Sequence, residues 1–290
     1  MLSNVCALMV MALVSSCEKM VLADGAESGR EEQGNVVLRV TQFEQTPFGA
    51  LTRGEAGDYC SRLCFHVYDD EGVRVSYVNE KQEDTGYGTA SLSLDAGHYY
   101  LVVVGHSGSS NPSFYANERV SVSGTQLGDT FWCCEELEVG DEEIERDLVL
   151  HRIVSLVRFL PADERPENLN QVIFSYQGSR GTFDGLTGYG STNARQNYEL
   201  NLTTDHDDIQ FYTIPRAFRD EIDLDVKTYY VEDNGRVHSL TAKTISGVPI
   251  QRNSVTICRG NLFDNRSSTK SAFITVSVDG EWGEDINLSF

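Results

Sequence analysis

Positive charge, proline and long apolar runs are scarce in this sequence. It has 23 Lys and Arg against 44 Asp and Glu, which gives a net charge of −21 at pH 7. An acidic excess of this size argues against nucleic acid and anionic lipid headgroups as partners. Only 6 Pro occur among 290 residues, and the strand-forming residues Val, Ile, Tyr, Phe and Thr are abundant. This composition favours a β-rich globular chain.

The motifs of common catalytic sites are also missing. The sequence has no Gly-x-Ser-x-Gly elbow, no His-Glu-x-x-His pair and no Gly-rich phosphate loop before a helix. His106, in Gly105-His106-Ser107-Gly108, is the only histidine in a small, mobile context, and a loop histidine held by backbone contacts is the better interpretation. We therefore predict no enzyme activity and no cofactor, with a lipid-anchored hydrolase as the disfavoured alternative.

Metal sites find little support either. The acidic loops 69–71 and 205–208 could hold Ca²⁺ through carboxylate oxygens, but neither has EF-hand spacing, so solvated turns are the better interpretation. Zinc-type C-x₂-C spacing is absent among the cysteines after residue 17, which are Cys60, Cys64, Cys133, Cys134 and Cys258. We predict no metal and interpret these cysteines as small buried side chains. The sequence leaves open whether two of them pair after export.

The first seventeen residues resemble an export signal that ends in a lipid-attachment site. Residues 1–16 carry no charged side chain, and their apolar centre is shorter than the about 20 residues of a membrane-spanning helix. Ser15-Ser16-Cys17 resembles the lipobox of bacterial lipoproteins, in which the thiol takes diacylglycerol as a thioether. We predict a signal peptide over 1–16, lipidation of Cys17, a flexible tether over 17–34 and attachment to a membrane surface through the lipid. An ordinary signal peptide with a chance cysteine is the alternative.

Short stretches of alternating apolar and polar residues recur along the rest of the chain, separated by turn signals. We expect strands at 36–43, 63–68, 73–78, 91–94, 98–106, 130–132, 137–139, 144–150, 153–160, 172–176, 198–202, 211–214, 222–231, 236–242, 255–258, 272–278 and 286–288. The turns at 69–72 and 233–235 predict hairpins, and 98–106 predicts a central strand buried on both faces. About seven strands on each side of residue 150 predict an all-β fold of two tandem β-sandwich domains, 35–150 and 151–290.

Several segments, in their order and spacing, resemble a known family. They are 14–17, 63–72, 94–107, 128–132, 152–159 and 248–263, and they include an apolar strand ending in Asp and Gly, an L-x-x-G-x-Y strand ending in Gly-His, and an Asp-Thr-Phe segment. Together they resemble the FimB-type anchor lipoproteins of Bacteroidales type V fimbriae. The resemblance implies two transthyretin-like (Ig-like) sandwiches and a non-enzymatic role, in which the subunit ends polymerisation and fixes a fimbria to the outer membrane. It also implies fimbrial shaft subunits as partners, joined by strand complementation.

The first expected strand is the candidate for that complementation. Val36, Leu38 and Val40 alternate with polar or outward positions, as a strand that fills a groove requires, because every second side chain must enter the core. The resemblance suggests that an anchor retains this strand, whereas polymerising subunits lose its equivalent to proteolysis. An ordinary first strand with no such role is the alternative.

Two further functions stay open on the sequence. A carbohydrate- or host-binding surface lipoprotein could share the same architecture and would expose aromatic side chains on loops; the candidates are Tyr87, Phe114, Tyr115, Phe183 and Tyr189. An accessory or tip subunit of the same superfamily would share the fold but not the anchoring role.

Overall fold

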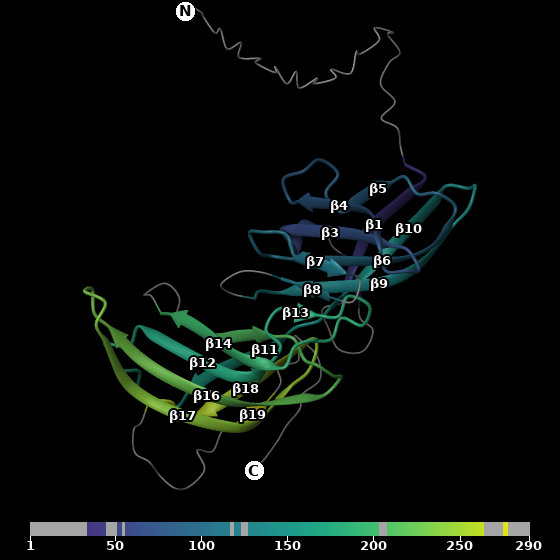
Figure 1. Ribbon diagram of the computed structural model, residues 1–290. Coiled ribbons are helices and arrows are strands. Elements are labelled where there is room, and N and C mark those ends of the chain that lie inside the picture. The colour runs from purple at the N-terminus through teal and green to yellow at the C-terminus, as the bar shows by residue number, and fades with distance from the viewer. Residues whose placement is uncertain are drawn as a thin grey trace, which may run out of the picture. The chain divides into compact units, whose positions relative to one another are not determined.

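The computed structural model describes residues 34–44, 51–53, 56–116, 119–122, 127–202, 208–263 and 275–277 (Figure 1). The predicted signal peptide, Cys17, most of the predicted tether and the strand expected at 286–288 lie outside these residues. Where the chain is described, no helix is long or apolar enough to cross a membrane.

Ten strands precede residue 153. They are β1 (Val36–Glu44), β2 (Leu51–Arg53), β3 (Arg62–Tyr68), β4 (Arg74–Lys81), β5 (Thr89–Leu92), β6 (Gly97–His106), β7 (Ser113–Ala116), β8 (Arg119–Ser121), β9 (Thr130–Val139) and β10 (Ile144–Arg152). A 3₁₀ helix (Ala56–Asp58) follows β2.

Nine strands follow. They are β11 (Ser155–Pro161), β12 (Gln171–Gly178), β13 (Thr182–Phe183), β14 (Ala194–Asn201), β15 (Ile209–Thr213), β16 (Asp220–Val231), β17 (Val237–Ile250), β18 (Ser254–Gly260) and β19 (Thr275–Ser277). The all-β prediction is confirmed, and both predicted hairpins form, with Gly72 and Gly235 in the left-handed turn conformation that the sequence indicated. The strands expected at 130–132 and 137–139 are two ends of one strand, β9, and β2, β7, β8 and β13 were not expected.

The first core is enclosed by one eight-stranded sheet. Its order is β2-β1-β10-β9-β6-β3-β4, and β5 pairs with β1 while also contacting β4, so the sheet closes over its own inner face. Leu63 and Phe65 of β3, Leu101 and Val103 of β6, and Leu148 of β10 fill the inside and are fully buried. As predicted, β6 lies between two strands, and its residues 101–106 are buried on both faces.

The second core lies between two four-stranded sheets. One has the order β15-β11-β18-β19 and the other β14-β12-β16-β17. Phe159, Phe174 and Phe211 stack at the centre, with ring centroids 4.8–5.2 Å apart, and Val226 and Ile250 pack around them. This arrangement is a β-sandwich whose inner faces alternate with solvent-facing polar positions.

A third, small sheet combines strands from both sides of residue 150. Its order is β13-β8-β7, so residues 182–183 pair with residues 120–121 (Figure 1). Phe183 and Val120 pack there against Val102 and Val104, on the outer face of β6. The described residues from Gly34 onward accordingly form one compact unit by their contacts. The division into separate domains at residue 150 stays a prediction.

Polar contacts reinforce the same junction. Arg152 binds both carboxylate oxygens of Asp129 at 2.7 Å and the side chain of Asn253 at 3.0 Å. Trp132 Nε1 donates a hydrogen bond to the carbonyl of Gly185 at 2.7 Å, so the loop after β13 is held against β9.

Candidate strand-complementation site

The predicted groove-filling strand, β1, is an interior strand of the first sheet. On one side it runs parallel to β10, from Val36 opposite Ile144 to Glu44 opposite His151. On the other side it is antiparallel to β5 over residues 36–39 and to β2 over residues 42–44. β1 therefore occupies a slot between strands that come later in the chain, and its backbone is paired on both sides over most of its length.

The three predicted inward side chains lie in the core. Val36 and Leu38 are fully buried and Val40 is 7% exposed, within the cluster that fills the first sheet. Burial of a Val or Leu side chain contributes roughly 1.5–3 kcal/mol, so this row holds the strand in place. Val37, expected on the solvent side, is also buried.

A β-bulge interrupts β1 at Thr41. Val40 lies opposite Leu148 of β10, and Gln42 lies opposite the next residue, Val149. Thr41 therefore has no partner on β10 and is the extra residue of the bulge. The bulge shifts the alternation by one position, so Phe43 rather than Gln42 enters the core and is fully buried. The alternation in which every second side chain of β1 enters the core therefore continues only up to Val40.

The start of β1 is fixed by a residue that sequence reasoning missed. The Asn35 side chain donates to the carbonyl of Leu94 at 2.8 Å and accepts from the Leu94 N–H at 2.9 Å, while the Asn35 carbonyl accepts from the Ile144 N–H at 2.8 Å. This single side chain satisfies two backbone groups and sets the register of the strand. The only hint in the sequence was an amide residue directly before an apolar run.

Glu80 on β4 also supports β1, through a glycine. Its carboxylate accepts a hydrogen bond from the Gly88 N–H at 2.8 Å, and the Gly88 carbonyl accepts one from the Val40 N–H at 2.9 Å. Burial raises the pKa of Glu80 above its ordinary value, although the bond from Gly88 opposes that shift. The ladder of β1 therefore continues across the gap between β5 and β2.

Two ion pairs join β1 to β10 at the surface. Arg39 Nη1 lies 2.8 Å from a Glu145 carboxylate oxygen, and His151 Nδ1 lies 2.8 Å from a Glu44 oxygen. The hydrogen bond to Glu145 raises the pKa of Arg39, and the one from Arg39 lowers the pKa of Glu145. Both pairs are open to solvent, so they contribute to register more than to stability.

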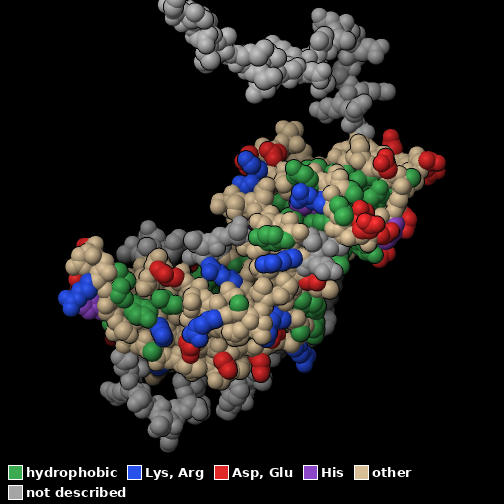
Figure 2. Space-filling model, viewed as in Figure 1, with side chains coloured by type: hydrophobic (Ala, Val, Ile, Leu, Met, Phe, Trp, Pro, Cys, Tyr) green, Lys and Arg blue, Asp and Glu red, His purple; other side chains and the backbone are tan. Residues whose placement is uncertain are grey.

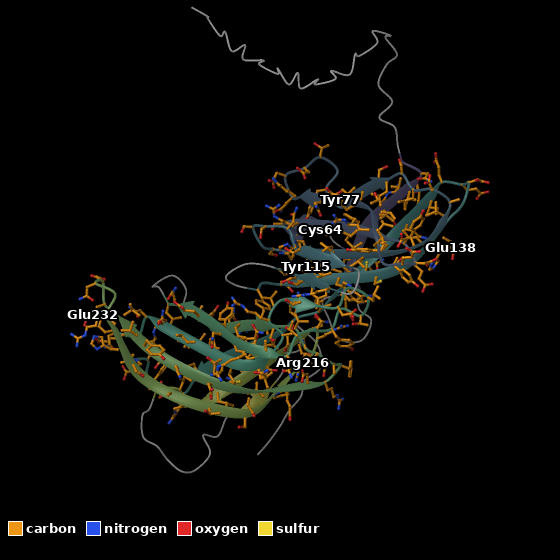
Figure 3. The ribbon with its side chains drawn as sticks, in the orientation of Figure 1. Cys64, Tyr77, Tyr115, Glu138, Arg216 and Glu232 are labelled. Carbon is orange, nitrogen blue, oxygen red and sulfur yellow. The ribbon has the colours of Figure 1, made fainter. Side chains whose placement is uncertain are left out.

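Of the five aromatic residues considered for carbohydrate binding, one is buried, three are half-buried and one is exposed. Phe183 is fully buried, Phe114 stacks on His66 with centroids 3.5 Å apart, and Tyr189 lies under the guanidinium of Arg252. Tyr115 on β7 is the exposed member, at 65%, and Figure 3 shows it beside the small sheet. On the face in Figure 2, hydrophobic side chains form small groups between polar ones.

The remaining candidates do not assemble into a reactive centre. Burial lowers the pKa of His106 to about 4, and its Nδ1 accepts from the Gly108 N–H. One carboxylate oxygen of Asp69 accepts hydrogen bonds from the N–H groups of Glu71 and Val73 within its own turn. Residues 205–207 of the second acidic loop lie outside the described residues. Within the described part of the chain, no group of three or more His, Cys, Asp or Glu side chains is placed to hold a metal ion.

All five described cysteines are free thiols. Burial raises the pKa of Cys64 and Cys258 to about 12 and that of Cys134 to about 11, and it also raises the pKa values of Cys60 and Cys133. These thiols stay protonated and unreactive at neutral pH, in keeping with their interpretation as small core side chains.

Two solved proteins of low sequence identity share this fold, and a third is less similar. A candidate polysaccharide binding protein from Bacteroides thetaiotaomicron is 11% identical, with a TM-score of 0.55 and coverage of 88% of this chain and 97% of that one. A candidate adhesin from Bacteroides ovatus is 13% identical, with a TM-score of 0.51 and coverage of 89% and 97%. The fimbrial anchor protein Mfa2 from Porphyromonas gingivalis is 12% identical, with a TM-score of 0.44 and coverage of 88% and 99%.

No curated protein matches the sequence. One family model does, over residues 28–289, and its description is a family of unknown function, DUF6562. Because the match spans nearly the whole chain, the protein belongs to the DUF6562 family.

Proposed function

We propose that this protein is a non-enzymatic cell-surface subunit of fimbriae, and specifically the anchor subunit that keeps its own first strand. The observation that carries the proposal is the position of β1. It fills a slot between β10 and β5, with Val36, Leu38 and Val40 in the core. A subunit whose slot is already filled offers no place for a neighbour's strand, and a chain of strand donations would end at it.

The slot has the properties that strand exchange requires. Removing β1 would uncover the apolar interior of the first sheet and leave the facing edges of β10 and β5 without ladder partners, which is a costly state. An incoming strand with apolar residues at every second position would repair both losses. Retention of β1 therefore separates an anchor from a polymerising subunit.

A similarity in fold and a resemblance in sequence both support the proposal that the protein is a fimbrial subunit. The fold is that of proteins described as candidate adhesins and polysaccharide binders of Bacteroides, and the sequence segments noted above resemble fimbrial anchor lipoproteins. In this setting lipidation of Cys17 would tether the body to the outer membrane through residues 18–34. The partners would be shaft subunits, and no nucleic acid is involved.

N-terminal sequencing of the protein recovered from assembled fimbriae tests the retained strand. The proposal expects a mature terminus before Asn35, together with β-rich pilin partners after mild crosslinking. A terminus beyond Phe43 would show that β1 is removed and would recast the protein as a polymerising or tip subunit. Recovery of glycans without pilins would favour the carbohydrate-binding alternative.

The lipid tether has its own test. Cys17→Ala should release the protein from the membrane fraction of the cells that produce it, whereas Cys258→Ala, at a buried thiol, should leave it membrane-bound. If Cys17→Ala still sediments with membranes as the unaltered protein does, lipidation is not the anchor.

A further inference from the structure

A groove of about 910 Å³ opens beside β1, between the start of β5 at Thr89 and the end of β2 at Arg53. Its described walls come from the bulge of β1, the 3₁₀ helix and the turn before β5. The side chains that line it include Arg39, Thr41, Asp58, Gln82, Tyr87 and Thr89. The volume lies within the range of known small-molecule sites. The anchor role does not account for this hollow.

The backbone around the groove is shaped to keep it open. Thr41 is the extra residue of the β1 bulge, and bulges recur next to binding sites because they turn a side chain out of the regular alternation. Gly86 and Gly88 on the opposite wall have φ values of 81° and 95°, which favour glycine. A Cβ on Gly88 would lie 3.3 Å from the Cβ of Ala56, so a side chain there would crowd the floor.

The side chains that line the groove combine one aromatic ring with planar polar groups. Tyr87 is half-buried, and its hydroxyl donates to the Cys60 carbonyl at 2.8 Å, which fixes the ring. The Gln82 amide nitrogen donates to the Gly57 carbonyl at 2.9 Å, which fixes the amide plane. Asp58 and Thr89 are exposed beside them. A fixed ring with amide, carboxylate and hydroxyl groups around it suits a ligand that has both C–H faces and many hydroxyls.

The charged side chains around the groove favour a neutral ligand over an anionic one. The cation among these six side chains, Arg39, is already paired with Glu145 at 2.8 Å, and Asp58 adds a negative charge at the rim. An anionic ligand would meet a carboxylate and a neutralised arginine in a chain of net charge −21. We propose that this groove binds a neutral oligosaccharide, with Tyr87 beneath a sugar ring and Asp58 and Gln82 accepting from or donating to its hydroxyls.

The site goes beyond the anchor role and depends on β1 being in place, because Arg39 and Thr41 belong to that strand. A sugar held there would contact β1, the turn before β5 and the 3₁₀ helix at once. The ligand would thus bind the form of the protein that keeps its first strand.

The test is isothermal titration of the mature chain with linear neutral hexasaccharides built from glucose, mannose, galactose, xylose or N-acetylglucosamine, with oligogalacturonate as the acidic probe. The groove variant is Asp58→Ala/Gln82→Ala, at two exposed positions. The matched control is Asp233→Ala/Gln177→Ala, where Gln177 likewise donates to a backbone carbonyl on the surface. Thermal melting of all three proteins checks that they are equally folded.

We expect saturable binding of at least one neutral probe, at least tenfold weaker in the groove variant and unchanged in the control. The proposal is overturned if no neutral probe binds, if only oligogalacturonate binds, or if the groove variant binds as well as the unaltered protein. A Tyr87→Phe variant sharpens the result, since it keeps the ring but frees it from Cys60, and it should weaken binding less than the double variant does.

Discussion

β1 and β11 occupy similar places in the two halves of the chain but are held differently. Each is the first strand of its half and runs parallel to a later strand, β10 for β1 and β18 for β11. β11 keeps an unbroken register with β18 over seven residues and with β15 over five. β1 has a bulge on one side and two short neighbours on the other.

β11 is therefore paired continuously with both of its neighbours, whereas the pairing of β1 is interrupted on both sides. The connection into β11 is fixed by Arg152, whose guanidinium binds Asp129 and Asn253 directly before the strand begins. Besides its ladder with β10, β1 is held by Asn35, by a hydrogen bond from the Val40 N–H to the Gly88 carbonyl and by solvent-exposed ion pairs. Of the two, β1 is the strand that could be exchanged at the lower cost.

The largest effect is expected at the anchored strand. Arg152→Ala would leave the Asp129 carboxylate partly buried without its cation, and the free energy of unfolding should fall by about 3–5 kcal/mol. Urea denaturation measures the loss. The double variant Arg152→Met/Asp129→Asn should recover part of it, because no unpaired charge remains. A loss below about 1 kcal/mol for the single variant would mean that this pair does not fix β11.

A matched pair of leucines tests the comparison directly. Leu38 in β1 and Leu156 in β11 are both at most 1% exposed, so truncation of either to Ala should cost about 2–5 kcal/mol in unfolding free energy. Hydrogen exchange should nevertheless differ: Leu38→Ala should speed exchange across β1 alone, whereas Leu156→Ala should affect β11 together with β18 and β15. Equal loosening of both strands by both variants would remove the distinction.

A smaller, pH-dependent effect is expected from Glu80, which supports β1 through Gly88. Burial holds its pKa above the ordinary value of 4.5, so the folded state binds the proton more tightly than the unfolded state does. The stability from this group is complete below the unfolded pKa and is lost as pH rises through the folded pKa. Glu80→Gln should therefore melt at a higher temperature than the unaltered protein at pH 7, and the two melting temperatures should converge below about pH 4.5. A variant that melts lower at pH 7 would show that the bond from Gly88 outweighs the burial.

The smallest effect is expected at Arg39. Its ion pair with Glu145 is solvent-exposed, so Arg39→Gln should leave the melting temperature nearly unchanged, and any difference should vanish in 1 M salt. Persistence of a clear difference at high salt would indicate that Arg39 stabilises β1 by contacts other than charge.

The strands that the sequence predicted are those with regular alternation or a continuous apolar run among neighbouring residues. The segment 98–106 and the hairpins at Gly72 and Gly235 needed only neighbouring residues to be recognised. β9 was divided because Glu135 and Glu136 interrupt its apolar pattern, although Cys133 before them and Leu137 after them face the same core. β7, β8 and β13 are only two to four residues long, which is too short for a local pattern to reveal them, and β13 forms by pairing with β8, far earlier in the chain.

The candidate site was predictable in part for the same reason. Alternation placed Val36, Leu38 and Val40 in the core, but the bulge at Thr41 depends on how β10 pairs with the strand. The aromatic residues were chosen for their loop-like surroundings, and tertiary packing decided their exposure: Phe183 is buried by β8, while Tyr115 is not covered. Asn35 acts through Leu94, 59 residues away, and Glu80 acts through Gly88, which in turn bonds the distant Val40; neither residue has a sequence signature.

The small sheet has a consequence for the order in which the chain can fold. Ser121 of β8 and Thr182 of β13 are bonded across 61 residues, and Phe183 covers Val102 and Val104 of the first half. As the chain is synthesised or exported from its N-terminus, the first half must wait with an uncovered apolar face until residue 183 emerges. Such non-local closure slows folding, and we expect a kinetic phase that is lost when Phe183 is replaced by Ala.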